Sequence, residues 1–453
     1  MSEEAPPSPV MRPVFYDGCP GCAMERKLES SQGIPYKEFF FVGITTIASC
    51  LPISSLFPFL YFMVEDLHVA KKEQDIGLYA GFLGASYMIG RCFASLFWGV
   101  VADRADRIGR KPIIKFSILS VVIFNTLFGL SVKYWMAIAT RFLLGALNGM
   151  LAPIKAYSIE VCRPEHQALG LSIVSTGWGI GLVVGPAIGG YFAQAAKQYP
   201  NIFSEKSIFG RFPYFLPCLC ISLIALVVLI SCIWLPETLH KHKNTEGEIE
   251  MIDNSRSTLE EDSHKQKSLY KNWPLISSII AYCVFTLHDT AYSEVFSLWA
   301  VSDKRYGGLS FLSKEVGRVL AVAGAGLLVY QFFIYRSVHK FLGSINSSRI
   351  ALVTLSIPIL AAYPFMTHLS GLRLGIALYL GTILKGVLSV TIITGTSLLQ
   401  NNAVVTQSQR GAANGISTTA MSFFKAIAPA GAGALCSLGP KNAKMQPSSQ
   451  VYN

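Results

Sequence analysis

Ionisable side chains interrupt several long apolar stretches of this sequence, and their types and positions could do chemistry. Asp289 and His288 are neighbours in the apolar run 273–300. A buried carboxylate changes its proton affinity when a neighbouring cation moves, and histidine titrates near neutral pH. We therefore predict that these two residues couple proton movement to a second process. The alternative is a fixed ion pair between Asp289 and a Lys or Arg, and Glu294 is expected to lie at a rim.

Cations outnumber carboxylates among the charged residues of these apolar runs. We predict that Arg141, Lys385 and Lys425 bind a substrate carboxylate, because guanidinium and ammonium groups bind carboxylates well. The excess favours an anionic or zwitterionic small molecule over bare zinc, which would require Asp and His clusters with ligand spacing. The alternative for Arg141 is a structural role with hydrogen bonds to backbone carbonyls. The alternative for Lys385 is snorkelling towards the lipid headgroups.

A Cys-x2-Cys pair, Cys19 and Cys22, lies near the start of the chain in a predicted tight turn. Such a pair can bind a metal or act as a redox pair, but a closed zinc site has four ligands. His240 and His242 are candidates to complete that site, and the alternative is a simple exposed turn. The sequence contains no nucleophile elbow, phosphate-binding loop or dinucleotide fingerprint, so it supports neither an enzyme nor a bound cofactor.

The composition indicates which structure positions these residues. With 51% hydrophobic residues, 14% charged residues and a mean hydropathy of +0.43, the chain is too apolar for an ordinary soluble protein. The net charge of +11 comes from basic residues in short loops between apolar runs. This pattern indicates a membrane protein with its positive loops in the cytosol, and not a nucleic-acid-binding protein. The first residues lack the apolar core of a secretory signal peptide.

Eleven apolar runs are long enough to cross a bilayer as helices, which takes about 20 residues. They are 38–64, 76–100, 113–132, 135–158, 167–195, 213–235, 273–300, 317–338, 350–368, 372–397 and 411–437. We predict an all-α polytopic membrane protein with six and five transmembrane helices in two pseudo-symmetric bundles. Its predicted parts are a disordered cytosolic tail with Cys-Pro-Gly-Cys (1–36), a six-helix bundle (37–235), a cytosolic charged loop (236–272), a five-helix bundle (273–437) and a polar tail (438–453).

Small residues suggest how these helices pack. Gly177, Gly181, Gly185 and Gly189 recur every four residues, so they share one helix face on which another backbone can approach closely. Pro186 should add a kink. The helix is expected either to lie where two bundles meet and move, or to show ordinary close packing. An ungapped internal alignment of 167–190 with 410–433 places Pro186 on Pro429 and Gly190 on Gly433, as expected for parallel repeats.

Several motifs resemble the major facilitator superfamily. They are the loop WGVVADRADRIGRKP (98–112), the fourth-helix pattern Arg141-x3-Gly145 and the antiporter pattern Ser172-x8-Gly181-x3-Gly185-Pro186-x2-Gly189-Gly190. The Cys-Pro-Gly-Cys tail and PETLHKH (236–242) look like those of the plant zinc-induced facilitator-like proteins. The resemblance implies conformational roles for the loop and fifth-helix motifs, namely for Asp103, Asp106, Gly109, Arg110, Lys111, Gly181, Gly185, Pro186, Gly189 and Gly190.

The resemblance also implies proton-coupled export of small organic molecules or metal-linked cargo from the cytosol, across the vacuolar or plasma membrane. Members of this family are associated with zinc and iron handling through nicotianamine or phytosiderophores, and with potassium and auxin homeostasis. Together with the excess of cations, it leads us to expect a secondary active transporter that exchanges protons for a small organic anion or zwitterion.

Two features depart from the family pattern. Ala102-Asp103-Arg104 is repeated as Ala105-Asp106-Arg107, so either Asp103 or Asp106 must supply the single carboxylate of the loop motif. The twelfth helix of the superfamily is also expected to be absent. The alternative function is therefore a truncated, non-transporting isoform that regulates a full-length transporter.

Overall fold

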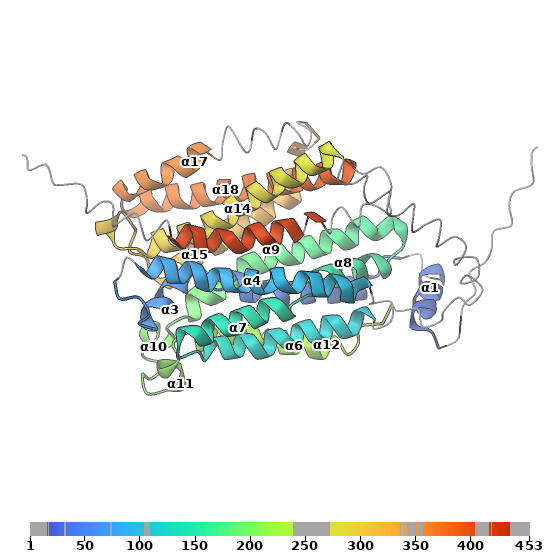
Figure 1. Ribbon diagram of the computed structural model, residues 1–453, viewed down its shortest axis with the longest axis horizontal. Helices are drawn as coiled ribbons and strands as arrows, with labels where there is room; N and C mark the ends of the chain where they lie inside the picture. Colours follow the sequence, from blue (N-terminus) through green and yellow to red (C-terminus); the bar gives the residue numbers. More distant parts are fainter. Residues whose placement is uncertain are drawn as a thin grey trace, which may run out of the picture.

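The computed structural model describes residues 16–30, 33–72, 75–103, 109–238, 272–335, 357–403 and 416–434, except 17 and 418, and a few single positions between 337 and 350. Within these residues the chain forms helices and no strands, as predicted. Figure 1 shows the long helices running side by side. Six helices in the described residues are long and apolar enough to cross a membrane: Tyr36–Ser54, Arg110–Gly129, Ser172–Phe192, Trp273–Val301, Ser313–Ile334 and Gly371–Thr396.

The first half of the chain forms one bundle. Its main helices are α2 (Tyr36–Ser54), α3 (Leu60–Asp66), α4 (Ile76–Asp103), α6 (Arg110–Gly129), α7 (Tyr134–Leu147), α8 (Leu151–Glu160), α9 (Gln167–Phe192) and α12 (Phe215–Ser231). Two short helices, α10 (Ala195–Gln198) and α11 (Ile208–Arg211), follow α9. They mark one end of the molecule in Figure 1, which we call the α10–α11 end.

Two predicted spans of this bundle are broken instead of continuous. The run 38–64 forms α2 and α3, because Pro58 disfavours a helical backbone at Phe57. The run 135–158 forms α7 and α8, and Pro153 lies in the first turn of α8, where a missing N–H is tolerated. At this second break the Asn148 side chain donates a hydrogen bond to Ser49 Oγ at 3.0 Å.

The second half of the chain forms the other bundle. It contains α14 (Trp273–Val301), α15 (Ser313–Val329) with a π-helical continuation η4 (Tyr330–Ile334), α17 (Ile357–Ala362) with a 3-10 continuation η6 (Tyr363–His368), and α18 (Gly371–Asn402). Residues 419–434 form a further helix. The segment in which the twelfth helix is predicted to be absent, 435–453, lies outside the described residues.

The expectation of a disordered tail is wrong for part of residues 1–36. A helix, α1 (Pro20–Ser30), forms there and lies at the opposite end from α10 and α11 (Figure 1). Proline suits the first position of a helix, and contacts with the bundle hold the rest. Lys27 Nζ lies 2.6 Å from Glu38 Oε1, and Arg163 Nε donates to Leu28 O at 2.9 Å. These long-range contacts are invisible to local sequence patterns.

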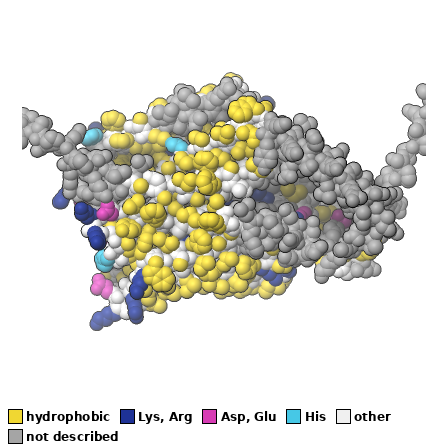
Figure 2. All heavy atoms as spheres, in the orientation of Figure 1, with side chains coloured by type: hydrophobic (Ala, Val, Ile, Leu, Met, Phe, Trp, Pro, Cys, Tyr) yellow, Lys and Arg dark blue, Asp and Glu magenta, His cyan; other side chains and the backbone are white. Residues whose placement is uncertain are grey.

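The outer surface of the helices is apolar. Figure 2 shows hydrophobic side chains across the middle of the visible face, whereas charged side chains gather near the α10–α11 end. Large apolar side chains such as Phe93, Val227 and Leu380 are exposed on three different helices. An apolar band of this extent is expected where helices face lipid.

The glycine row of α9 packs within its own bundle. Gly177, Gly181, Gly185 and Gly189 all face α2, and a Cβ at Gly181 would lie 2.5 Å from Cys50 Cβ. This contact agrees with the close-packing alternative for these four glycines. The helix itself continues without interruption through Pro186.

Two other small-residue contacts join the bundles. On α9, Gly190 lies against Gly317 of α15, so that a Cβ at Gly190 would be 2.7 Å from Gly317 Cα. On α4, Gly81 meets Gly433 of the helix 419–434, with 3.1 Å between a Cβ at Gly81 and Gly433 Cα. Gly190 and Gly433 are the residues that the internal alignment pairs. Equivalent positions in the two repeats therefore make equivalent contacts across the bundle interface.

Both contacts lie towards the α10–α11 end. Gly190 is close to the end of α9, and Gln198 of α10 donates a hydrogen bond to Ser313 Oγ, at the start of α15, at 3.1 Å. Gly81 is in the second turn of α4, and α4 follows α3, which ends at Asp66. Gln194, just before α10, donates a hydrogen bond to Asp66 at 3.2 Å, so the start of α4 lies near this end. The two bundles are therefore held together closely at this end of the molecule.

Candidate functional site

An ion pair links two helices of the second bundle. Lys385 of α18 donates from Nζ to Asp289 Oδ1 of α14 at 2.6 Å, and Ser389 Oγ donates to the same oxygen at 2.9 Å. Lys385 and Ser389 are four residues apart and therefore share a helix face. The Lys385 ammonium also lies 3.9 Å from the centroid of the Tyr292 ring, one turn beyond Asp289. Asp289 and Lys385, both singled out from sequence, thus form an ion pair, as in the alternative that pairs Asp289 with a Lys or Arg.

The pair is largely withdrawn from solvent. The Lys385 side chain is 11% exposed and the Asp289 side chain 25% exposed. The Tyr292 hydroxyl forms a hydrogen bond of 2.7 Å with Tyr363 of η6, which fixes the ring beneath the ammonium. Charges removed from water interact strongly, and removing one leaves its partner uncompensated. A proton added to Asp289 would therefore weaken its contact with Lys385.

Two further predicted residues lie near this pair. Lys425, on the helix 419–434, is close enough to Asp289 to interact with it electrostatically. His288 interacts in the same way with both Asp289 and Lys385, and its ring centroid lies 6.1 Å from that of Phe285. Three of the predicted residues, Lys385, Lys425 and His288, therefore interact with the carboxylate of the fourth, Asp289. The roles assigned to them remain predictions.

Arg141 belongs to a different cluster, within the first bundle. Its residue is 2% exposed, and Nη1 donates to the carbonyl oxygen of Pro52 at 2.8 Å. The guanidinium carbon lies 5.2 Å from the ring centroid of Tyr87 and 5.3 Å from that of Phe128. Backbone and aromatic contacts of this kind match the structural alternative for Arg141. In this conformation the guanidinium is not open to a ligand.

The rim position expected for Glu294 is wrong. Its residue is 0% exposed, and neither carboxylate oxygen has a hydrogen-bond partner among the described residues. The oxygens face Gly84 of α4, where a Cβ would lie 3.0 and 3.2 Å from them. Glu294 thus lies at the interface between the bundles and faces α4. Sequence reasoning missed this because the burial depends on a glycine in a helix that is far away in the sequence.

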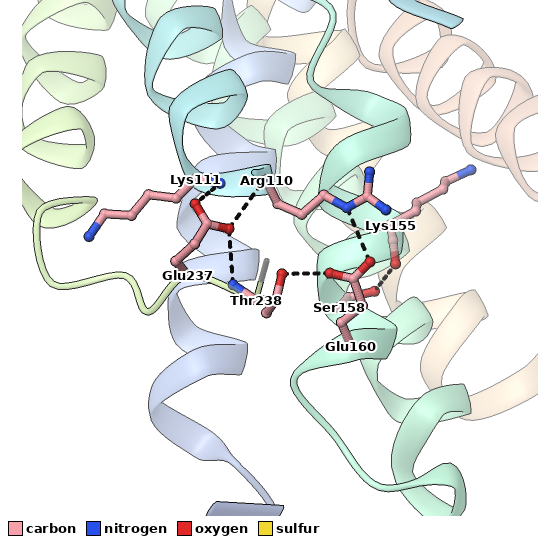
Figure 3. A network of polar contacts seen from close by, with 7 residues as sticks. All are labelled: Arg110, Lys111, Lys155, Ser158, Glu160, Glu237 and Thr238. Carbon is pink, nitrogen blue, oxygen red and sulfur yellow. Dashed lines mark hydrogen bonds and ion pairs between the residues drawn. The ribbon is translucent and has the colours of Figure 1, made fainter. Parts of the chain in front are cut away.

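A polar network occupies the end of the bundle that carries α1, where α6 begins (Figure 3). The Glu237 carboxylate accepts hydrogen bonds from the backbone N–H of Arg110 at 3.0 Å and of Lys111 at 3.2 Å. A carboxylate at this position stabilises a helix N-terminus. Gly109, just before the helix, has φ 91°, a left-handed value that favours glycine.

The same network reaches α8 and explains the PET sequence. Arg110 Nε donates to Glu160 Oε1 at 3.1 Å, and Thr238 Oγ1 donates to Glu160 Oε2 at 2.6 Å (Figure 3). The residue that caps the loop motif's helix is therefore Glu237, which sequence reasoning did not select. Asp106 lies outside the described residues, as does the side chain of Asp103. Which of these two acts in the loop motif remains a prediction.

Comparisons with known proteins identify the fold and family. The sequence model of the Major Facilitator Superfamily matches residues 42–429. The chain belongs to the Major Facilitator Superfamily. It is 52% identical over 470 residues to Protein ZINC INDUCED FACILITATOR 1 of Arabidopsis thaliana, with 100% of this chain and 95% of that protein covered. It is also 52% identical over 432 residues to ZINC INDUCED FACILITATOR-LIKE 1 of the same plant, with 94% and 89% covered.

Solved transporters share the fold of this chain. A D-xylose–proton symporter matches with a TM-score of 0.66 at 12% identity, covering 87% of this chain and 89% of the symporter. A human organic anion transporter matches with a TM-score of 0.60 at 14% identity, covering 90% and 95%. The family match confirms the predicted family and the prediction that the chain is a transporter and not an enzyme. The structural matches confirm the all-α membrane fold. The protein is an integral membrane transporter.

The Cys-x2-Cys pair near the start of the chain is not in an exposed turn. Cys19 immediately precedes α1, Cys22 lies in its first turn, and both residues are buried. His240 and His242, the proposed further ligands, lie outside the described residues. The described residues contain no group of three or more His, Cys, Asp or Glu that could hold a metal ion. The metal site therefore remains a prediction.

Proposed function

We propose that this transporter exchanges protons for a small organic zwitterion or anion, with Asp289 as the coupling carboxyl. The ion pair between Asp289 and Lys385 supports this proposal most directly. A carboxylate bound to a mobile ammonium changes its proton affinity when the ammonium leaves. The pair therefore lets one proton determine where Lys385 binds, and lets a ligand of Lys385 determine whether Asp289 holds a proton.

The pair favours a zwitterion over a simple anion if transport is antiport. A substrate carboxylate would take Lys385, and a substrate ammonium would take Asp289, so each charge would exchange one partner for another of the same sign. A protonated Asp289 cannot bind an ammonium group. Proton and substrate would then compete for the same carboxylate, as antiport requires. A simple anion would instead bind best when Asp289 is protonated, and both would move together.

The other predicted residues surround this exchange site. Lys425 lies within electrostatic range of Asp289 and would offer a second cation to the substrate carboxylate. His288, adjacent to Asp289, would receive or deliver the proton. Arg141 would join the substrate only if its hydrogen bond to Pro52 opened during the transport cycle.

The names of the relatives suggest the class of cargo. Two proteins 52% identical to this chain are called zinc-induced facilitators. We propose that the cargo is an amino-carboxylate metal chelator, such as nicotianamine or a phytosiderophore, and that its export contributes to zinc, iron or potassium homeostasis. The membrane would be the vacuolar or plasma membrane. Amino-carboxylates carry both charges that the Asp289–Lys385 pair is suited to bind.

Transport in proteoliposomes with an imposed pH gradient tests the proposal. We expect chelator uptake to depend on the gradient in the wild-type protein and to lose that dependence in Asp289→Asn. Glu205→Gln, which removes an exposed carboxylate at the α10–α11 end, is the matched control and should behave as wild type. Uptake that ignored the gradient would exclude antiport, and full coupling in Asp289→Asn would exclude the role of Asp289.

A further inference from the structure

Glu294 is an interior carboxyl that the proposed exchange does not use. It lies on α14 five residues beyond Asp289, about 7.5 Å farther along the helix axis. We propose that Glu294 is a second proton-binding site, which holds a proton while the bundles are closed at the α10–α11 end and releases it when they part. This inference rests on the proposed proton exchange and adds a step to it.

Glu294 lacks a hydrogen-bond partner among the described residues. Both Glu294 oxygens are buried, and neither accepts a hydrogen bond from any described residue. Its neighbour Asp289 has two donors, Lys385 and Ser389. An ionised carboxylate without donors loses its hydration and gains no hydrogen bonds in exchange, which is unfavourable. The neutral acid suits this site much better than the anion does.

Glu294 also lies at the interface between the two bundles. Its oxygens face Gly84 of α4, where a Cβ would lie 3.0 Å away. Gly77, Gly81 and Gly84 share one face of α4, since they are spaced by four and three residues. Gly77 and Gly81 contact Gly433 in the other bundle. The glycines that contact the other bundle and the glycine that faces Glu294 therefore lie on neighbouring turns of the same face of α4.

The charged groups around Glu294 do not replace a hydrogen-bond donor. Arg141 of α7 interacts electrostatically with Glu294, but its Nη1 is bound to Pro52 and its guanidinium carbon lies within 5.3 Å of two ring centroids. Its Nε is also buried and has no hydrogen-bond partner among the described residues, so it makes no hydrogen bond to Glu294. From α4, Gly84 presents no side chain, and Tyr87 follows one turn later. From α18, Lys385 is bound to Asp289. Arg141 thus offsets part of the unfavourable energy of the anion without a direct contact.

These observations give the proton a sequence of sites. When the interface opens at the α10–α11 end, water reaches Glu294 and stabilises its anion. When the interface closes, water leaves and the neutral acid is favoured. Glu294 is nearer to this end than Asp289, so a proton entering from this side meets it first. Protonation of Glu294 would therefore be required for closure, and Asp289 would respond to the substrate.

Infrared pH-difference spectroscopy of the full-length protein in lipid nanodiscs tests the inference. A protonated carboxyl has a C=O stretching band that a carboxylate lacks. Titration from about pH 5 to about pH 9 covers the range of buried carboxyls. We expect a band at neutral pH that is lost in Glu294→Gln and retained in Asp289→Asn and Glu205→Gln. Glu294→Asp should keep a band at a shifted position. A wild-type band that persists unchanged in Glu294→Gln or Glu294→Asp, or that is absent in wild type, would overturn the proposal.

Hydrogen–deuterium exchange supplies the conformational readout. We expect exchange in peptides covering residues 76–90 to increase with pH in wild type, because ionised Glu294 opens the interface. In Glu294→Gln this increase should be lost, whereas Asp289→Asn should retain it. An unchanged pH dependence in Glu294→Gln would contradict the inference even if Asp289→Asn loses coupled transport. Conversely, coupled transport in Asp289→Asn would overturn the proposed exchange but not the Glu294 site.

Discussion

Two carboxylates on one helix illustrate how packing decides the role of a charge. Asp289 and Glu294 both lie in the middle or later turns of α14. Asp289 receives hydrogen bonds from Lys385 and Ser389 of α18, within its own bundle. Glu294 faces a glycine of the other bundle and has no donor among the described residues. The first arrangement stabilises an anion, whereas the second favours a neutral acid. Breaking the Asp289 pair should therefore destabilise the protein, whereas neutralising Glu294 should stabilise it.

The largest effect on stability is expected from breaking the Asp289 pair on one side. Lys385→Ala leaves the largely enclosed Asp289 carboxylate without its bound cation, which should lower the free energy of unfolding by about 3–5 kcal/mol. Adding Asp289→Asn to Lys385→Ala should recover much of this loss, because neither charge of the pair then remains. Thermal unfolding of the purified variants measures both values. Equal stability of Lys385→Ala and wild type would show that the pair is not enclosed.

A substitution at the closed interface should have the next largest effect. Gly190→Ala places a methyl group 2.7 Å from Gly317 Cα, so the bundles must separate there by a small distance. Overpacking of this kind costs about 1–3 kcal/mol and should reduce transport several-fold. Gly431→Ala is the control, because a Cβ at Gly431 meets nothing within 4 Å. Equal transport by both variants would contradict the role of this contact.

Neutralising the unpaired carboxylate should have the opposite sign to breaking the pair. Glu294→Gln removes a charge that has no donor in the described part of the chain, so it should raise the free energy of unfolding by about 1 kcal/mol at alkaline pH. At acidic pH the wild-type residue is already neutral and the two proteins should be equally stable. Unfolding temperatures measured across this pH range test the prediction. A loss of stability at alkaline pH would mean that Glu294 is held as an anion.

The smallest effect is expected far from both carboxylates, at the capped end of α6. Glu237→Gln keeps the side-chain size but removes the charge that receives the N–H groups of Arg110 and Lys111. The expected loss is about 0.5–1 kcal/mol, typical of a helix N-terminus. Thermal unfolding again provides the measurement, with proton coupling expected to be retained. Lost coupling would place this network in the exchange itself.

The paired site could be predicted from sequence, and the unpaired one could not. Charges inside apolar runs are unfavourable, so Asp289 and Lys385 were conspicuous, and their partnership needed only the expectation of two facing helices. The burial of Glu294 depends on Gly84, far away in the chain, whose lack of a side chain makes room for it. No local pattern contains that information.

The fold shows the same division. Apolar length and the motif of α9 predicted a helical membrane protein of the right family, because these signals are local. The breaks after α2 and α7 and the helix α1 were missed. They depend on prolines whose effect is set by context and on contacts such as Lys27 with Glu38. The sequence predicts Arg141 as a substrate ligand because a charge in an apolar run is conspicuous, whereas its contacts with Pro52 and two aromatic rings are tertiary.

The most direct test of the central claim is proton movement caused by substrate alone. Proteoliposomes containing a pH-sensitive dye and no imposed gradient would receive an amino-carboxylate chelator on one side. We predict a pH change inside the vesicles with the wild-type protein and with Glu205→Gln, and none with Asp289→Asn. A proton signal of wild-type size from Asp289→Asn would contradict the account, since the carboxylate bound to Lys385 would then not couple proton to substrate.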